Sequence, residues 1–150
     1  MEVKREYYLN QLISHKHNGL IKIISGIRRC GKSYLLSELF RKHLLAEGVK
    51  EDHIIHIALD DYEKKQYRNP DNCYQYVKSS IKDDEMYYLL LDEVQMMDSF
   101  EDVLNGFLHI KNLDVYVTGS NSKFLSKDVL TEFAGRGDEI HVFPLSFSEF

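Results

Sequence analysis

The segment from Lys22 to Leu36, KIISGIRRCGKSYLL, constrains the fold more than any other part of the chain. An apolar run ends at Gly26, the string Gly-Lys-Ser begins at Gly31, and apolar residues then recur at helical spacing. The pattern G-x-x-x-x-G-K-[ST] between a strand and a helix is typical of a loop that binds phosphate groups. The alternative is an ordinary helix-starting turn with an exposed lysine, and the flanking strand and helix patterns argue against it.

Each residue type in this loop has a physical reason. The two glycines let the backbone curl closely around a ligand, and backbone amides at the positive end of the helix then face the phosphates. Lys32 is expected to bind the β- and γ-phosphates, and the Ser33 hydroxyl is expected to ligate Mg²⁺. The expected cofactors are therefore ATP and Mg²⁺. The predicted nucleotide-binding set is Gly26, Ile27, Arg28, Arg29, Cys30, Gly31, Lys32, Ser33 and Tyr34.

The rest of the chain alternates between β-rich and helical patterns. Strands are expected at residues 20–26, 53–60, 86–94, 114–120 and 139–145, and the third is apolar enough to be buried on both faces. Helices are expected at 2–13, 35–44, 70–81, 100–110 and 122–130, and the polar segment ahead of Pro70 is expected to be a loop. This alternation predicts an α/β fold with a parallel sheet between two helical layers.

Polar residues follow two of the expected strands. Asp92 and Glu93 come directly after the apolar run YYLLL, so we expect Asp92 to hold Mg²⁺ and Glu93 to activate water as a general base. The next strand ends in VTGSN, which makes Ser120 or Asn121 the candidate sensor of the γ-phosphate, with Thr118 behind them. A strand-ending turn is the alternative for these two residues.

Arg136 lies between two glycines in the string GRGDE. An arginine placed there can stabilise the charge that develops on a transferred phosphoryl group, either in its own site or in that of a neighbouring subunit. An ordinary turn arginine is the competing interpretation.

Composition limits the other classes of function. The chain has 150 residues, which fits one domain, and its net charge of −5 argues against a broad nucleic-acid-binding surface. Cys30 and Cys73 are far apart and are expected to be free thiols, and His53 and His56 are expected on opposite faces of a strand instead of forming a zinc pair. The sequence has no run of apolar residues long enough to span a membrane and no signal-peptide pattern at its start, so we expect a cytoplasmic protein without membrane contact.

Together these stretches resemble the AAA-like P-loop ATPases of bacteria and archaea whose C-terminal half is a domain of unknown function. The resemblance is carried by REYYLNQL, IKIISGIRRCGKSYLL, YYLLLDEVQ, VYVTGSNS and FAGRGDEIHVFPLSFSEF. It implies a three-layer α/β/α fold with a five-stranded parallel sheet in the order 5-1-4-3-2, as in the division that has an extra catalytic glutamate. Because family members continue well beyond this length, it also implies that residues 1–150 are the N-terminal ATPase core of a longer protein.

The predicted activity is Mg²⁺-dependent hydrolysis of the ATP γ-phosphate, with Lys32, Glu93, Ser120 or Asn121, and Arg136 as catalytic candidates. We expect this segment alone to turn over slowly, because a lid or a group from C-terminal domains or a second copy is lacking. A switch that binds nucleotide with little turnover is the alternative. A small GTPase is disfavoured because the chain lacks an N-K-x-D string, and a small-molecule kinase usually lacks the paired acids.

Overall fold

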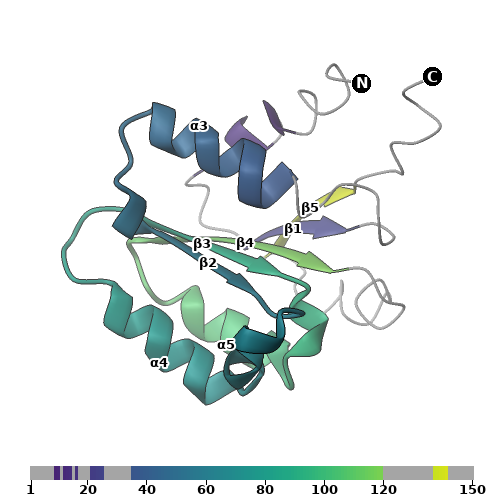
Figure 1. Cartoon of the computed structure of the whole chain (residues 1–150). Coiled ribbons are helices and arrows are strands. Elements are labelled where there is room, and N and C mark those ends of the chain that lie inside the picture. The colour runs from purple at the N-terminus through teal and green to yellow at the C-terminus, as the bar shows by residue number, and fades with distance from the viewer. Residues whose placement is uncertain are drawn as a thin grey trace, which may run out of the picture.

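Figure 1 shows the computed structural model, a twisted parallel sheet with helices on both faces. The structure describes residues 9–10, 12–14, 16, 21–25, 35–119 and 137–141. The predicted phosphate loop, the sensor candidates, Arg136 and the helix expected at 122–130 all lie outside these residues. The helix expected at 2–13 is described only in part.

Five parallel strands form the sheet. They are β1 (Ile21–Ser25), β2 (Ile54–Ala58), β3 (Tyr87–Asp92), β4 (Leu113–Gly119) and β5 (Gly137–His141). Their spatial order is β2-β3-β4-β1-β5, which confirms the expected order 5-1-4-3-2 read from the other edge. Consequently β4 separates β1 from β3, although β1 precedes both in the chain.

Helices cover both faces of the sheet. The π-helical turn η1 (Leu35–Phe40) continues into α3 (Arg41–Ala46) on one face, and α4 (Pro70–Ser80) and α5 (Phe100–Phe107) cover the other (Figure 1). Pro70 occupies the first turn of α4, where its missing N–H costs nothing, and the side chain of Asn69 caps that helix by accepting from the backbone N–H of Asn72 at 3.1 Å. The three-layer architecture expected from the sequence is confirmed.

Side chains that alternate along the strands divide into two cores. Ile55 and Ile57 of β2 and Leu89 and Leu91 of β3 pack with α4 and α5 on one face. On the other face the aliphatic and aromatic residues of η1 and α3 pack against Ile24, Tyr88, Leu90 and Tyr116. All six residues of β3 are buried, as the unbroken apolar run predicted. The second face is the one that holds the polar groups discussed below.

Several element boundaries differ from the expectations. The polar segment ahead of Pro70 is a 3₁₀ helix, η3 (Tyr62–Arg68), because the Asp61 carboxylate accepts from the backbone N–H of Glu63 and caps it. β3 ends at Asp92 instead of running to residue 94. β5 begins at Gly137, two residues before the expected start, since its pairing with β1 begins there without an apolar signal.

Two shorter features complete the described chain. His53 belongs to a 3₁₀ turn, η2 (Glu51–His53), and therefore precedes β2 instead of lying on it. A further 3₁₀ turn, η4 (Val94–Met96), follows β3. Within the described residues, no helix combines the length and the apolar character that a membrane span requires.

Candidate functional site

Asp92 is the last residue of β3 and lies at the end of the sheet where the parallel strands finish. Only 4% of its side chain is exposed, and each of its carboxylate oxygens has a hydrogen-bond partner. Oδ1 accepts from the Thr118 hydroxyl at 3.1 Å, and Oδ2 lies 2.9 Å from Nε2 of His56. A buried carboxylate is stable only when such partners replace its lost hydration, so these two contacts fix its orientation.

Thr118 links Asp92 to the strand that leads into the predicted phosphate loop. Its hydroxyl accepts from the backbone N–H of Glu93 at 2.9 Å and donates to Asp92. On the other side of β4, Thr118 is paired with Ile24, and the next pair is Ser25 with Gly119. The last residue of β1 is therefore two strand spacings, about 10 Å, from Asp92. Gly26, the first residue of the predicted loop, follows this strand end directly in the sequence.

Glu93 adopts a left-handed backbone conformation, with φ 55° and ψ 54°. Such a conformation is uncommon for a residue other than glycine, and here the hydrogen bond from its N–H to Thr118 supports it. Its residue surface is 8% exposed, and its Oε2 accepts from Nε2 of Gln95 at 3.2 Å. Within the described part of the chain, Oε1 of Gln95 is a buried acceptor without a hydrogen-bond partner. Gln95 Oε1 can thus accept from a donor that the described side chains do not supply.

His56 reaches this site from β2, which is an edge strand of the sheet. In the β2–β3 register Ala58 is opposite Asp92, so His56 contacts the carboxylate diagonally along the same face. An ionised carboxylate can only accept, so Nε2 carries the hydrogen in this contact. About a third of the His56 side chain is exposed, whereas Asp92 is not.

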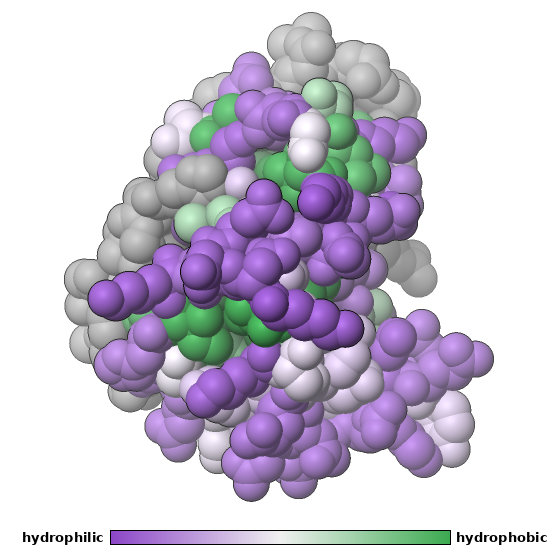
Figure 2. All heavy atoms as spheres, turned by 90° about the vertical axis from the view of Figure 1, so that its left-hand side faces the viewer, coloured by the Kyte–Doolittle hydropathy of each residue, from purple (hydrophilic) through white to green (hydrophobic). Residues whose placement is uncertain are grey.

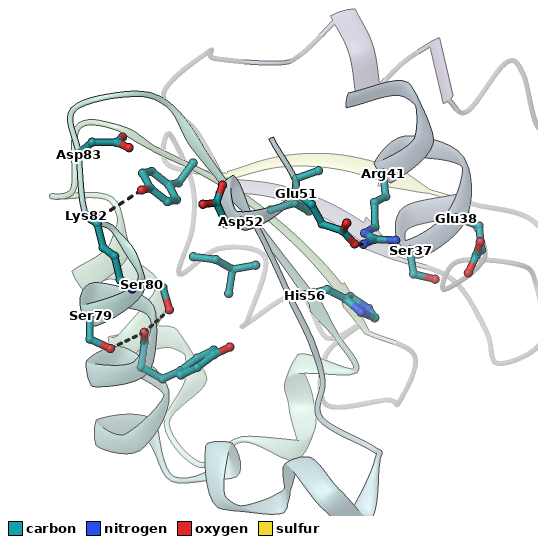
Figure 3. Close-up of a pocket in the computed structure, with 14 residues that line it drawn as sticks. Ser37, Glu38, Arg41, Glu51, Asp52, His56, Ser79, Ser80, Lys82 and Asp83 are labelled. Carbon is teal, nitrogen blue, oxygen red and sulfur yellow. Dashed lines mark hydrogen bonds and ion pairs between the residues drawn. The ribbon is translucent and has the colours of Figure 1, made fainter. Parts of the chain in front are cut away.

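The exposed part of His56 lines a cavity of about 860 Å³ along the outer side of β2. Figure 3 shows Arg41 and Ser37 from the η1–α3 helix near His56, and Ser79 and Ser80 of α4 across the cavity. His56 lines this cavity, whereas Asp92 does not.

A model of the protein family described as an AAA domain matches residues 18–150. The chain belongs to the AAA domain family. The match covers the predicted phosphate loop, the acidic pair and the closing strand, and with the α/β fold it confirms the expected AAA-like P-loop ATPase core.

Proteins similar in sequence to this AAA domain are much longer. An uncharacterized protein of Haemophilus influenzae is 35% identical over 149 residues, which cover 99% of this chain and 37% of that protein. Uncharacterized protein MJ1544 of Methanocaldococcus jannaschii is 32% identical over 134 residues, 87% of this chain and 28% of that protein. The chain therefore spans about a third of the length of these relatives.

Solved structures share the fold of this AAA domain at low sequence identity. A DNA polymerase III gamma subunit-related protein of Thermotoga maritima has a TM-score of 0.62 at 13% identity, over 97% of this chain and 48% of that chain. PCH-2 of C. elegans gives 0.62 at 14% identity, over 93% of this chain and 41% of the other. A chain in the structure of Drosophila ORC bound to DNA gives 0.61 at 12% identity, over 95% of this chain and 93% of the other.

Of the residues predicted from the sequence, Asp92 and Glu93 lie together at the end of β3. The other predicted site residues lie outside the described residues: Gly26, Ile27, Arg28, Arg29, Cys30, Gly31, Lys32, Ser33, Tyr34, Ser120, Asn121 and Arg136. Their roles stay predictions.

The sequence analysis did not predict the contacts of His56 and Gln95 with the acidic pair. It considered His56 only beside His53, expecting both on one strand with opposite directions. The structure gives the two histidines separate partners for a different reason, because His53 lies in η2 and only His56 lies on β2. The available signal was weak: polar residues at the ends of parallel strands gather at one edge of the sheet. That rule does not say which of them touch.

Proposed function

We propose that this AAA domain binds Mg·ATP at the loop that begins at Gly26 and hydrolyses the γ-phosphate. The observation that supports this most strongly is the contact of Thr118 with both Asp92 and the backbone of Glu93. Because Thr118 is also paired with Ile24 of β1, the acidic pair lies at the end of the sheet where β1 finishes, and the predicted loop follows β1 in the sequence. A phosphate loop that follows β1 and acids at the end of β3 can face the same triphosphate, because only β4 lies between the two strands.

The donor set fits a hard divalent cation. Mg²⁺ prefers a few carboxylate or hydroxyl oxygens together with water, and Asp92 with Ser33 offers that chemistry. The His56 and Thr118 contacts hold the Asp92 carboxylate in one orientation, which limits what a metal must reorganise. When bound, the metal and ATP supply the positive charge and the phosphoryl group that the reaction requires.

The protein's own residues then have separate tasks. Lys32 and the loop amides bind phosphate oxygens and stabilise their charge. A Glu93 carboxylate oxygen takes a proton from water. Oε1 of Gln95, which has no hydrogen-bond partner among the described residues, can accept the second hydrogen of that water and fix its position. Ser120 or Asn121 contacts the γ-phosphate, and Arg136 stabilises the charge that develops on it.

Binding and turnover of nucleotide by two variants and two controls test this proposal. Lys32→Ala is expected to lose nucleotide affinity, whereas Glu93→Gln keeps the affinity and loses turnover by a factor of about 10²–10⁴, the usual contribution of a general base. Lys111→Ala and Glu101→Gln are the controls, since both residues lie outside the predicted site.

The outcomes separate the two candidate functions. An ATPase shows Mg²⁺-dependent turnover that Glu93→Gln removes. A nucleotide switch binds ATP but shows little turnover with either Glu or Gln at position 93. Absence of saturable nucleotide binding by folded protein, or equal losses in the control variants, contradicts both.

The longer relatives suggest what completes the site. We propose that residues 1–150 are the ATPase core of a longer protein, in which C-terminal domains or a second copy supply a lid or an arginine. Arg136 is the residue of this chain that can act in a neighbouring subunit.

A further inference from the structure

His53 lies at the opposite end of the sheet from Asp92, in the η2 turn that leads into β2. Only 6% of its side chain is exposed. The imidazole stacks on the ring of Tyr87 with centroids 4.2 Å apart, which fixes its plane. Figure 2 looks onto this end of the molecule, where many of the side chains that face the viewer are hydrophilic.

Both ring nitrogens of His53 face carboxylates. Nδ1 lies 2.7 Å from Oδ1 of Asp52, and Nε2 lies 3.1 Å from Oδ2 of Asp83 and 3.2 Å from Oε2 of Glu85. Asp83 and Glu85 come from the loop that leads into β3, so two chain segments contribute to one cluster. In Figure 3, Asp52 and Asp83 lie toward the same end of the cavity along β2, away from Ser37 and Arg41.

The loop that holds the two acids is fixed by Asn112. The side-chain amide of Asn112 donates to the backbone carbonyl oxygens of Asp83 at 3.0 Å and Glu85 at 2.9 Å. The backbone carbonyl of Asn112 accepts from the N–H of Tyr87 at 2.8 Å. The N–H of Glu85 donates to Oδ1 of Asp83 at 2.9 Å, and the N–H of Lys82 donates to the Tyr87 hydroxyl at 3.0 Å. The loop backbone and the Asp83 carboxylate are therefore placed before any ligand arrives.

This arrangement requires a positive charge. When Nδ1–H is donated to Asp52, the neutral imidazole presents a lone pair at Nε2 to two groups that can only accept. Either a proton or a metal ion must therefore lie between Nε2 and the carboxylates. The cluster thus attracts cations in general.

The distances match ligands around one metal ion. Nitrogen and oxygen ligands bound at about 2.0–2.2 Å are roughly 3.0–3.5 Å from one another, and Nε2 is 3.1 and 3.2 Å from its two carboxylate neighbours. The three ligand atoms all lie within 4.8 Å of each other. The Asp52 carboxylate behind Nδ1 gives the carboxylate–histidine arrangement that orients most metal-binding histidines.

We propose that His53, Asp83 and Glu85 bind a single divalent transition-metal ion, with Zn²⁺ as the best chemical fit and water in its remaining positions. One imidazole with two carboxylates suits Zn²⁺, and the mixed donor set is less suited to Mg²⁺ or Ca²⁺, which take oxygen ligands. The ion ties the entrance of β2 to the entrance of β3. It lies at the far end of the same strands from Asp92, so it is separate from the proposed nucleotide site.

Cobalt titration of metal-stripped, nucleotide-free chain tests the proposal, because Co²⁺ reports its coordination by visible absorption. The background is Cys30→Ser, which removes a thiol that can also bind the probe. We expect one Co²⁺ per chain, displaced by Zn²⁺, and at least tenfold weaker binding in Asp83→Asn and in Glu85→Gln. Both residues are exposed, so these variants are expected to fold.

Asp84→Asn is the matched control, since Asp84 is an exposed acid between the two proposed ligands and is outside the cluster. Its affinity for Co²⁺ should equal that of the background chain. No Co²⁺ absorption at millimolar metal means that a proton alone occupies the cluster and overturns the proposal. Equal weakening by Asp84→Asn means non-specific attraction and also overturns it.

Discussion

His56 Nε2 on β2 and Asp92 Oδ2 on β3 are 2.9 Å apart, so the outer strand of the sheet holds a carboxylate that is otherwise buried. The proposed metal ligand is therefore oriented by a residue outside the recognised motifs. Thr118 holds the other oxygen from β4, and the two contacts come from opposite sides.

Replacing His56 should change the Mg²⁺ requirement of the AAA domain. Groups that orient a metal ligand typically account for a factor of 10–100 in metal affinity, so we expect His56→Ala to raise the half-saturating Mg²⁺ concentration by about tenfold. Mg²⁺ titration of nucleotide binding measures this. His56→Gln, which keeps an N–H donor, should recover part of the loss, and His109→Ala at an exposed site should have no effect. An unchanged Mg²⁺ dependence in His56→Ala contradicts the positioning role.

Thr118→Val should cost more stability than Thr118→Ser. Valine keeps the volume but removes the hydroxyl, which leaves the N–H of Glu93 without its partner and Asp92 with one donor fewer. An unsatisfied buried group costs about 1–3 kcal/mol of unfolding free energy, whereas serine loses one methyl group, about 1 kcal/mol. Urea unfolding of the three proteins gives the comparison. A serine variant as unstable as the valine variant argues that the hydroxyl contributes little.

The pair Lys22 and Asp114 should be strongly coupled. Lys22 is completely buried on β1, and its ammonium group forms an ion pair with the Asp114 carboxylate on β4. The Tyr116 hydroxyl also donates to Asp114 at 2.7 Å. Asp114→Asn leaves the lysine without its main counter-charge, at a cost of about 3–5 kcal/mol. In a double-mutant cycle followed by urea unfolding, Lys22→Met with Asp114→Asn should cost less than the sum of the single changes. Additive costs would show that the two charges do not interact.

Cys73 should be unreactive in the folded protein. It is buried on α4, and burial raises the pKa of its thiol from 9.0 to about 12. The reactive thiolate is therefore scarce in the native state at pH 8, and burial also blocks access. In a Cys30→Ser background, a thiol reagent should label the chain only after denaturation. Equal labelling rates in native and denatured protein would contradict the burial of Cys73.

The same shift has a consequence at high pH. Because the folded pKa lies above the unfolded value, the stability from the neutral thiol is present in full below pH 9 and falls as pH rises toward about 12. Cys73→Ala should reduce that part of the alkaline destabilisation.

The isolated 150-residue chain should hydrolyse ATP slowly. We expect a monomer to lack the group or lid that the longer relatives can provide, and an arginine acting from a second copy is worth about 10³–10⁵ in rate. Steady-state turnover measured across protein concentrations checks this, with Arg136→Ala as the comparison. Fast turnover at concentrations where the chain is monomeric would show that the site is complete in one copy.

Local sequence patterns were enough for the main elements of the fold. The unbroken apolar run before Asp92 predicted a strand buried on both faces, and all six residues of β3 are buried. Pro70 and Asp71 predicted the start of a helix, and α4 begins at Pro70. These features depend on which residue types follow one another along the chain, so the sequence shows them directly. The strand order came from the family resemblance, because periodicity does not say which strands pair.

The contacts within the candidate sites were decided by register and loop geometry. His56 contacts Asp92, and His53 meets Asp83 and Glu85, because strands and loops distant in the sequence are aligned by backbone pairing. The Asp61 cap likewise turned an expected loop into η3. The sequence by itself therefore determined the order of elements and placed the acids at a strand end. Only the tertiary structure decided which side chains hold them, since hydrogen bonds between distant segments depend on ångström-scale alignment that no local pattern specifies.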